Sequence, residues 1–90
     1  MEEQKTIIDQ EKFIFNNTAY IARTYHPSGR SCIYGEIVYA DSGERPYRKM
    51  RAIAREYLRP YGIIIPTKAS SNVTHAAVRK LIETIKEHKK

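Results

Sequence analysis

The stretch that most constrains the fold is RPYRKMRAIAREYLRPYG, residues 45–62, because its residues separate into two faces of opposite character. At 100° per residue on an α-helix, apolar side chains gather on one face and arginines gather within an arc of about 80° on the other. An apolar face of this kind must pack against another element. That face comprises Tyr47, Met50, Ile53, Ala54, Tyr57, Leu58 and Tyr61. The arginine face comprises Arg48, Arg51, Arg55 and Arg59.

Prolines mark both ends of this helix. Pro46 suits a first helical turn, where the missing backbone N–H is not needed. Pro60 disfavours continuation, and Gly62 permits a turn out of the helix. The sequence therefore predicts a basic helix over residues 46–59. Glu56 directly follows Arg55, and sequence neighbours do not face each other on a helix, so the arginine face is expected to keep its charge.

The segment before this helix predicts a small antiparallel sheet. β-branched and aromatic residues recur in KFIF, TAYIARTY and SCIYGEIVYA, which is typical of strands. The pair Asn16-Asn17 tolerates positive φ and predicts a tight hairpin, and HPSG (26–29) and DSG (41–43) predict turns. We expect a three-stranded antiparallel β-meander over residues 12–40. Residues 1–10 are expected to be a frayed terminus leading into the first strand, or one helical turn.

A second helix is predicted over residues 73–87. Ser71 and Asn72 are good N-cap candidates before it. Ile63-Ile64-Ile65 reads as a short buried strand or an extended connector, so a fourth strand stays open. The fold class is α+β, in a single small domain over residues 1–90. The apolar stripe of the second helix comprises Val73, Ala77, Val78, Leu81, Ile82 and Ile85.

The positive charge of the chain is concentrated on the basic helix. Residues 45–59 hold six Lys/Arg and one Glu, a net charge of +5, out of a total of +6. Such a concentration favours a polyanionic partner, nucleic acid before an anionic membrane. No apolar run approaches the length of about 18 residues that a membrane span needs, and the lone Cys32 fits a reducing cytoplasm. Cys32 itself is expected to be a small core or sheet residue.

Catalysis and metal binding have little support in the residue pattern. His26, His75 and His88 are scattered, and none pairs with Cys32 or a carboxylate at metal-ligand spacing. We therefore expect no enzyme, no metal and no cofactor. A small nuclease built from Glu36, His26 and Arg30 stays a minor alternative. Glu36 is expected to face solvent on the third strand.

Residues 51–85 resemble helix-turn-helix segments of DNA-binding proteins. The matching positions are Arg51-Ala52-Ile53-Ala54-Arg55, Gly62-Ile63, Pro66, Thr74 and Val78-Arg79, which resemble the C-terminal arms of large serine recombinases. NVTHAAVRKLIETI is also similar to the recognition helix of winged-helix repressors such as arginine repressors. The resemblance implies that Thr74, His75 and Arg79 reach toward base edges, while Lys80 and the arginine face contact phosphates. Thirteen residues, 60–72, stand where a strict helix-turn-helix has three or four.

These observations lead to a small cytoplasmic DNA-binding protein as the first hypothesis. It would be a transcriptional or phage/mobile-element regulator and a homodimer on double-stranded DNA. The alternative is a protein-interaction module, for example a phage-encoded inhibitor or adaptor, whose basic helix grips an acidic or nucleic-acid-binding surface. RNA binding through tyrosines of the sheet is a third reading. Those tyrosines are Tyr20, Tyr25, Tyr34 and Tyr39.

Overall fold

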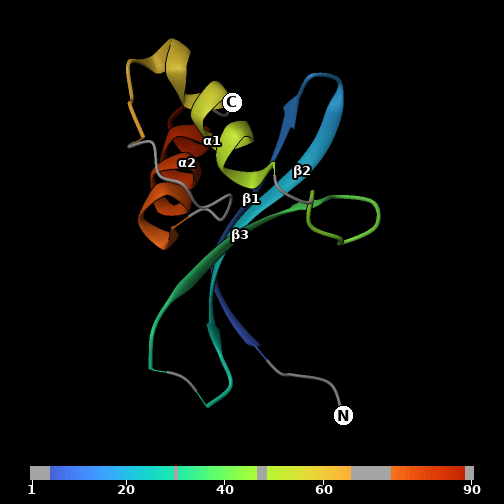
Figure 1. Cartoon of the computed structure of the whole chain (residues 1–90), viewed down its shortest axis with the longest axis vertical. Helices are drawn as coiled ribbons and strands as arrows, with labels where there is room; N and C mark the ends of the chain where they lie inside the picture. Colours follow the sequence, from blue (N-terminus) through green and yellow to red (C-terminus); the bar gives the residue numbers. More distant parts are fainter. Residues whose placement is uncertain (1–4, 30, 47–48, 66–73, 89–90) are drawn as a thin grey trace.

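A three-stranded sheet followed by helices confirms the predicted α+β fold (Figure 1). The computed structural model of the protein describes residues 5–29, 31–46, 49–65 and 74–88. The elements are β1 Lys5–Phe15, β2 Thr18–Pro27, β3 Tyr34–Tyr39, α1 Met50–Leu58, the 3-10 helix η1 Arg59–Tyr61 and α2 His75–His88. The strands are antiparallel and lie in the order β1-β2-β3.

The β1–β2 hairpin turns on the predicted asparagine pair. Asn16 has φ 52° and Asn17 has φ 62°, the left-handed values that a two-residue hairpin turn requires. The first strand begins at Lys5, however, rather than at residue 12, because β1 pairs with β2 as far as Pro27. The polar residues before residue 12 do not give the sequence pattern of a strand, although an edge strand of an antiparallel sheet tolerates polar side chains. The register shifts between Ile7 and Asp9, which marks a β-bulge at Ile8.

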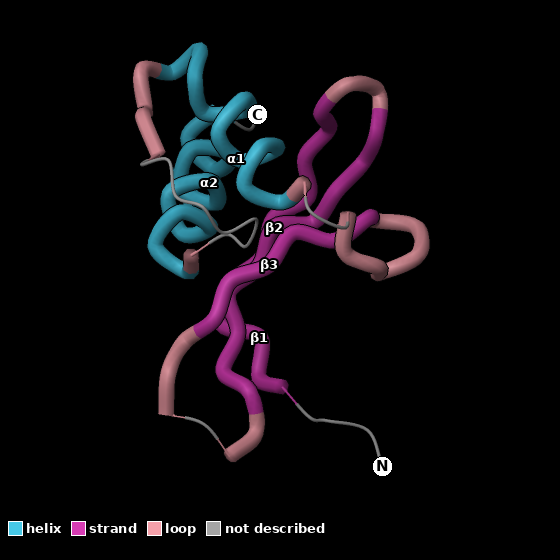
Figure 2. Tube along the Cα trace, viewed as in Figure 1, coloured by secondary structure: helices cyan, strands magenta, loops and turns pink. Residues whose placement is uncertain are grey.

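Both helices pack on one face of the sheet (Figure 2). The core lies between them and the strands, where Phe13, Tyr20, Ala22 and Ile37 meet the buried residues of the helices. α2 passes close to the sheet at Gly35 on β3. A Cβ atom at that position would lie 2.8 Å from Cβ of Val78 on α2. Gly35 therefore lets α2 approach the sheet more closely than any side chain would allow.

The basic helix begins later than predicted. α1 starts at Met50, not at Pro46, and Lys49 N–H donates to the Pro46 carbonyl in a turn before it. Pro46 is buried against the fold, so its ring has a packing role rather than the first-turn role expected from the sequence. At the other end, Gly62 adopts φ 77° and ends η1, as predicted.

Residues 63–65 are not a strand. Ile63 and Ile65 pack at the margin of the core, while Ile64 between them is exposed. The segment is thus the extended connector of the two possibilities that the sequence left open. α2 lies close to its predicted range of 73–87, and the N-cap candidates Ser71 and Asn72 fall outside the described residues.

The sheet is longer than the helical layer that covers it. The end where β1 begins and β2 finishes extends past both helices (Figure 1). Cys32, which lies in the connection from β2 to β3, is exposed. The expectation of a core or sheet position for Cys32 was wrong, because the chain there has already left the covered part of the sheet.

Candidate nucleic-acid interface

The arginines of α1 lie away from the residues that fix the helix to the core. Met50, Ile53, Ala54 and Leu58 are buried. Arg51 is half-buried, and the side chains of Arg55 and Arg59 are 40% and 68% exposed. The fourth arginine of the predicted row, Arg48, lies outside the described residues. The sequence-based division of this helix into an apolar and an arginine face therefore holds for α1 and the start of η1.

One acid partly neutralises this arginine face. Arg59 Nη2 lies 2.8 Å from Glu56 Oε2, and Arg55 Nε lies 3.5 Å from the same oxygen. The expectation that Glu56 leaves the positive charge of the arginine face unpaired was wrong. Glu56 and Arg59 are three residues apart on the helix and therefore face each other. Within the described residues the buried Arg55 Nε has no hydrogen-bond partner.

Charge is distributed unequally between the layers. Residues 49–59 hold Lys49, three arginines and Glu56, a net charge of +3. The described residues between 5 and 46 hold four Lys/Arg and five Asp/Glu, a net charge of −1. α2 holds three Lys/Arg and two Glu, a net charge of +1. The helical layer, and α1 above all, therefore carries the positive charge of the described chain.

Thr74 has a structural role at the start of α2. Its Oγ1 accepts a hydrogen bond from Ala77 N–H at 3.2 Å, and its carbonyl accepts one from Val78 N–H at 3.0 Å. This is the geometry of an N-cap. The Thr74 hydroxyl is thus already engaged with the helix, which the sequence reading of a base-contacting residue did not anticipate.

The other candidates on α2 are exposed but do not form a compact group. His75, Arg79 and Lys80 are all exposed. Arg79 and Lys80 are sequence neighbours, so their side chains leave the helix about 100° apart. Glu83 and Glu87 are exposed as well and lie between them on the helical wheel. The outward face of α2 is consequently of mixed charge, unlike that of α1.

The C-terminal ends of the two helices lie side by side. The rings of Tyr61 and His88 stack with centroids 4.4 Å apart, and Tyr57 lies between Tyr61 and Phe13 in a chain of ring contacts. At the same end Lys86 Nζ donates to both carboxylate oxygens of Asp9 on β1, at 2.9 and 2.8 Å. These hydrogen bonds raise the pKa of the Lys86 ammonium. The helical layer is thus attached to the sheet by surface contacts as well as by the core.

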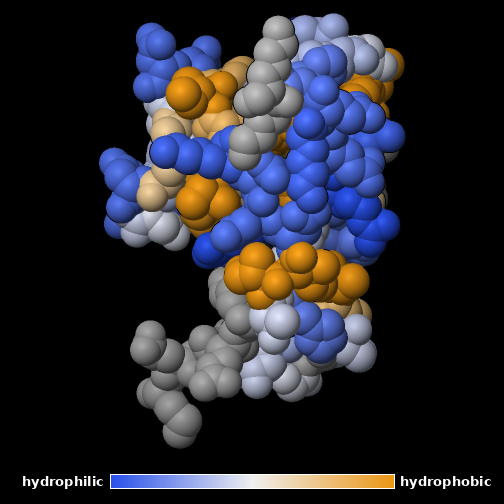
Figure 3. Space-filling model, turned by 180° about the vertical axis from the view of Figure 1, so that it is seen from behind, coloured by the Kyte–Doolittle hydropathy of each residue, from blue (hydrophilic) through white to orange (hydrophobic). Residues whose placement is uncertain are grey.

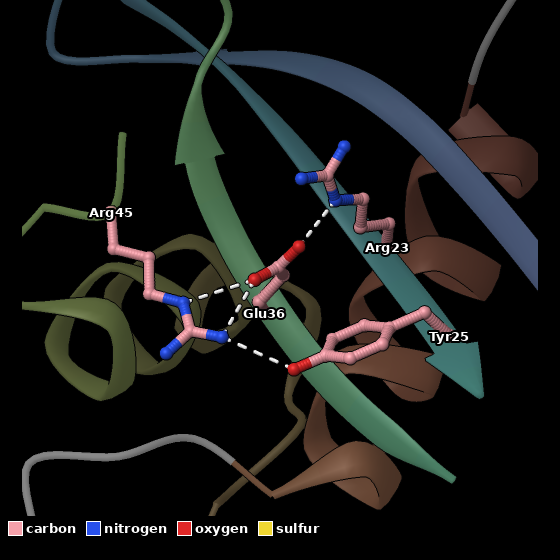
Figure 4. A network of polar contacts seen from close by, with 4 residues as sticks. All are labelled: Arg23, Tyr25, Glu36 and Arg45. Atoms are coloured by element: carbon pink, nitrogen blue, oxygen red, sulfur yellow. Dashed lines mark hydrogen bonds and ion pairs between the residues drawn. The ribbon is translucent and has the colours of Figure 1, made fainter. Parts of the chain in front are cut away.

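Glu36 is buried, which corrects its expected solvent-facing position. It is 1% exposed and binds two arginines, Arg23 from β2 and Arg45 from the loop after β3 (Figure 4). Arg45 also donates to the hydroxyl of Tyr25. Partial burial acts to lower the pKa of Arg45, but the hydrogen bond and charge of Glu36 outweigh it, and the pKa is raised. Arg30, the third member of the nuclease alternative, lies outside the described residues.

Most of the sheet tyrosines are used in packing. Tyr20 and Tyr25 are buried, and Tyr39 is half-buried with its ring stacked on that of Tyr20 at 5.3 Å. Tyr34 is exposed and lies beside Tyr25, with ring centroids 5.9 Å apart. A base-stacking platform for RNA needs several exposed rings on one surface. Of the four sheet tyrosines only Tyr34 is exposed, so they do not form such a platform.

Neither a metal site nor a membrane span emerges from the described residues. They contain no group of three or more His, Cys, Asp or Glu side chains placed to hold a metal ion. No helix among them is long and apolar enough to cross a membrane. No protein-family model matches the chain, and neither a curated protein nor a solved structure shows significant similarity to it.

Proposed function

We propose that the protein binds double-stranded DNA through the arginine face of α1, which comprises Arg51, Arg55 and Arg59. The observation that carries the proposal is the net charge of +3 over residues 49–59, on a helix whose opposite side is fixed in the core. A row of guanidinium groups on a fixed helix suits a phosphate backbone, because each group can donate two parallel hydrogen bonds to an oxyanion.

The ion pair between Arg59 and Glu56 is compatible with this role. The Arg59 side chain is 68% exposed and the Glu56 side chain is 37% exposed, and ion pairs at the surface contribute little to stability. A phosphate can therefore replace the Glu56 carboxylate on Arg59 at small cost. Glu56 would then keep the arginines ordered in the absence of DNA.

α2 supplies the second part of the proposed interface. Lys80 would contact a phosphate, and His75 and Arg79 would reach toward base edges. Thr74 would act indirectly, as the cap that fixes the start of α2. The biological role that fits is regulation of transcription or of a mobile element or phage, with two copies of the chain on one site.

A salt titration of duplex binding tests the phosphate contacts. For the double variant Arg55→Gln/Arg59→Gln, the slope of log K against log salt should fall by about 0.9 for each phosphate that the variant no longer neutralises. Lys86→Gln is the matched control, because it removes a charge that is paired with Asp9 and lies outside the proposed interface. A wild-type chain that binds no duplex even at low salt would rule the proposal out.

Sequence readout needs a separate measurement. Arg79→Ala should reduce the preference for a selected site over a scrambled one, whereas Arg55→Gln should weaken both equally. The selected site comes from enrichment of random duplexes on the wild-type protein. If enrichment returns no preferred sequence, α2 does not read bases and the protein binds phosphates alone.

The alternative, a protein-interaction module, is favoured by one observation. The strand order leaves the outer edge of β1 without a partner strand among the described residues, and such an edge can accept a strand from another protein. This reading predicts that one protein is captured in a pull-down and that the capture disappears when Arg55 and Arg59 are changed to Glu. Duplex binding would be absent in that case.

A further inference from the structure

A second pair of arginines is fixed on the sheet face opposite the helices (Figure 4). Glu36 Oε2 accepts a hydrogen bond from Arg23 Nε, and Glu36 Oε1 accepts one from Arg45 Nε at 3.0 Å. Arg45 Nη2 lies 2.8 Å from the same Oε1. One buried carboxylate thus orients two guanidinium groups that come from different parts of the chain.

Each guanidinium keeps hydrogen-bond donors that Glu36 does not use. Arg23 binds the carboxylate through Nε alone, and its two terminal nitrogens have no partner among the described residues. Figure 4 accordingly draws a contact of Arg23 with Glu36 through Nε and none through those nitrogens. Arg45 likewise leaves Nη1 without a partner there. The side chain of Arg45 is 51% exposed and that of Arg23 is 23% exposed, so both guanidinium-bearing side chains reach the surface.

The surrounding face is of mixed character: the neighbouring row is Lys12, Ile21 and Val38, and the exposed Ile14 follows Lys12 on β1. Gln10 on β1 pairs with Arg23, which pairs with Glu36, so these residues form a row across all three strands. Lys12 is exposed and follows Gln10 on the same side of β1, because alternate residues of a strand share a face. Seen from behind, the molecule has a mostly hydrophilic surface that is interrupted by separate hydrophobic patches (Figure 3). The exposed acids nearest to Arg45 in the sequence are Asp41 and Glu44, which lie in the same loop.

From this arrangement we infer that the sheet face opposite the helices is a second surface for nucleic-acid phosphates, contacted by Arg23 and Arg45. The unit has two guanidinium groups and one carboxylate, so it keeps a net charge of +1 after its internal pairing. Pre-oriented guanidinium groups bind phosphate oxygens well, because binding restricts them little further. The row lies open on a sheet rather than in a closed cavity, which suits an extended polyanion better than a small ion.

This surface adds a second DNA-binding face to the proposed function. Its arginines differ from those of α1, so the two surfaces can be tested separately. The α1 arginines belong to the layer on one side of the sheet, and the Arg23–Arg45 pair lies on the other. A single chain could then hold two duplex segments at once. The consequence is an architectural activity, the bridging of DNA, in addition to binding at one site.

Two variants test the phosphate contacts of this face in different ways. Arg45→Gln removes one exposed donor group and leaves Glu36 paired with Arg23. Arg23→Gln/Glu36→Gln removes a positive and a negative charge together, so the net charge is unchanged. Both should lower the salt slope of duplex binding by about 0.9, and the matched control Lys86→Gln should leave it unchanged. Wild-type slopes for both variants would overturn the inference.

Bridging is measured by energy transfer between donor-labelled and acceptor-labelled duplexes. Wild type should bring them together, and Arg45→Gln combined with Arg23→Gln/Glu36→Gln should abolish the transfer. A dimer that bridges through α1 alone would keep the transfer in that variant, which contradicts the inference. If Arg55→Gln/Arg59→Gln binds like wild type while the sheet-face variants fail to bind, the α1 proposal fails and the sheet-face inference stands. A wild type that binds neither duplex nor single strands refutes both.

Discussion

At the scale of single residues, Glu36 joins β2 to the loop that follows β3. Arg23 belongs to the middle strand, and Arg45 belongs to the loop that leads from β3 toward α1. By binding both, Glu36 fixes the path of the chain from the sheet face into the helical layer. Its burial is tolerated because each of its oxygens accepts a charge-assisted hydrogen bond.

Replacing Glu36 with Gln should destabilise the fold by about 2–3 kcal/mol. Removing one partner of a buried pair usually costs about 3–5 kcal/mol, but here both arginines are partly hydrated, which reduces the cost. The measurement is the midpoint of urea unfolding, followed by circular dichroism. Glu44→Gln is the control, because Glu44 is exposed, and it should leave the midpoint unchanged. Equal midpoints for both variants would contradict this role of Glu36.

The role of Glu36 could not be predicted from the sequence because it depends on register and on a distant loop. The Asn16-Asn17 turn is a local signal, and the hairpin that it predicted is present. The pairing of Arg23 with Glu36 requires the alignment of β2 with β3, which are joined by a longer connection. Arg45 reaches Glu36 only after the loop folds back. Polar pairs between residues far apart in the sequence produce no periodic pattern from which they could be predicted.

At the scale of elements, the contact between α2 and β3 depends on the missing side chain at Gly35. Val78 and His75 occupy the space where a Cβ atom would lie, with the nearest atoms at 2.8–2.9 Å. Both are part of a helix with a long buried face, so α2 cannot shift locally without disturbing other core contacts.

Gly35→Ala should therefore destabilise the protein by about 1–3 kcal/mol, the usual cost of overpacking. Adding Val78→Ala removes one of the clashing atoms, Cγ2, so the double variant should lose less stability than the two single variants summed. A double-mutant cycle from urea unfolding measures this coupling. Purely additive effects would show that α2 moves away from β3 freely.

The cap of α2 gives a second prediction at this scale. Thr74→Ala should cost about 1 kcal/mol, because Ala77 N–H loses its acceptor, whereas Thr74→Ser should keep most of the stability. Thermal unfolding of the two variants provides the comparison. If Thr74→Ser and Thr74→Ala unfold alike, the hydroxyl does not stabilise the helix. The pair also separates capping from any contact of the methyl group with DNA.

Element types were predictable here, while element ends were not. Periodicity identified α1 and α2 because their buried faces are continuous, and the β-branched and aromatic residues of TAYIARTY identified β2. α1 begins later than predicted because Pro46 is buried in a turn and does not occupy the first turn of the helix. The length of β1 differed because its first residues mix polar side chains with the exposed Ile7 and Ile8, and because the strand begins beyond the helical layer.

At the scale of the whole molecule, sheet and helices share one hydrophobic core. Residues from β1, β2, β3, α1 and α2 all belong to the same buried cluster. Among the described residues neither layer has a separate hydrophobic core, so the two layers should unfold together. The sheet also separates the two proposed phosphate surfaces, since one lies on the helical layer and the other on the opposite face.

Leu81→Ala tests this dependence. Leu81 is fully buried, and its truncation should cost about 2–5 kcal/mol, a large part of the roughly 5–15 kcal/mol typical of a domain. Near-UV and far-UV circular dichroism should report the same lowered midpoint, because tyrosine packing and secondary structure depend on one core. Separate transitions for the two signals would show that the sheet survives without α2.

The β-bulge at Ile8 has a consequence for how copies of the chain meet in concentrated solution. The extra residue reverses which face each side chain takes, so an incoming strand cannot follow the whole of β1 in one continuous register, although a shorter strand can still pair on one side of the bulge. At the opposite edge, Tyr39 N–H is already occupied by the carbonyl of Glu44. Edge-to-edge growth of one molecule on the next is interrupted at both sides, which protects a small sheet protein against polymerisation into fibres.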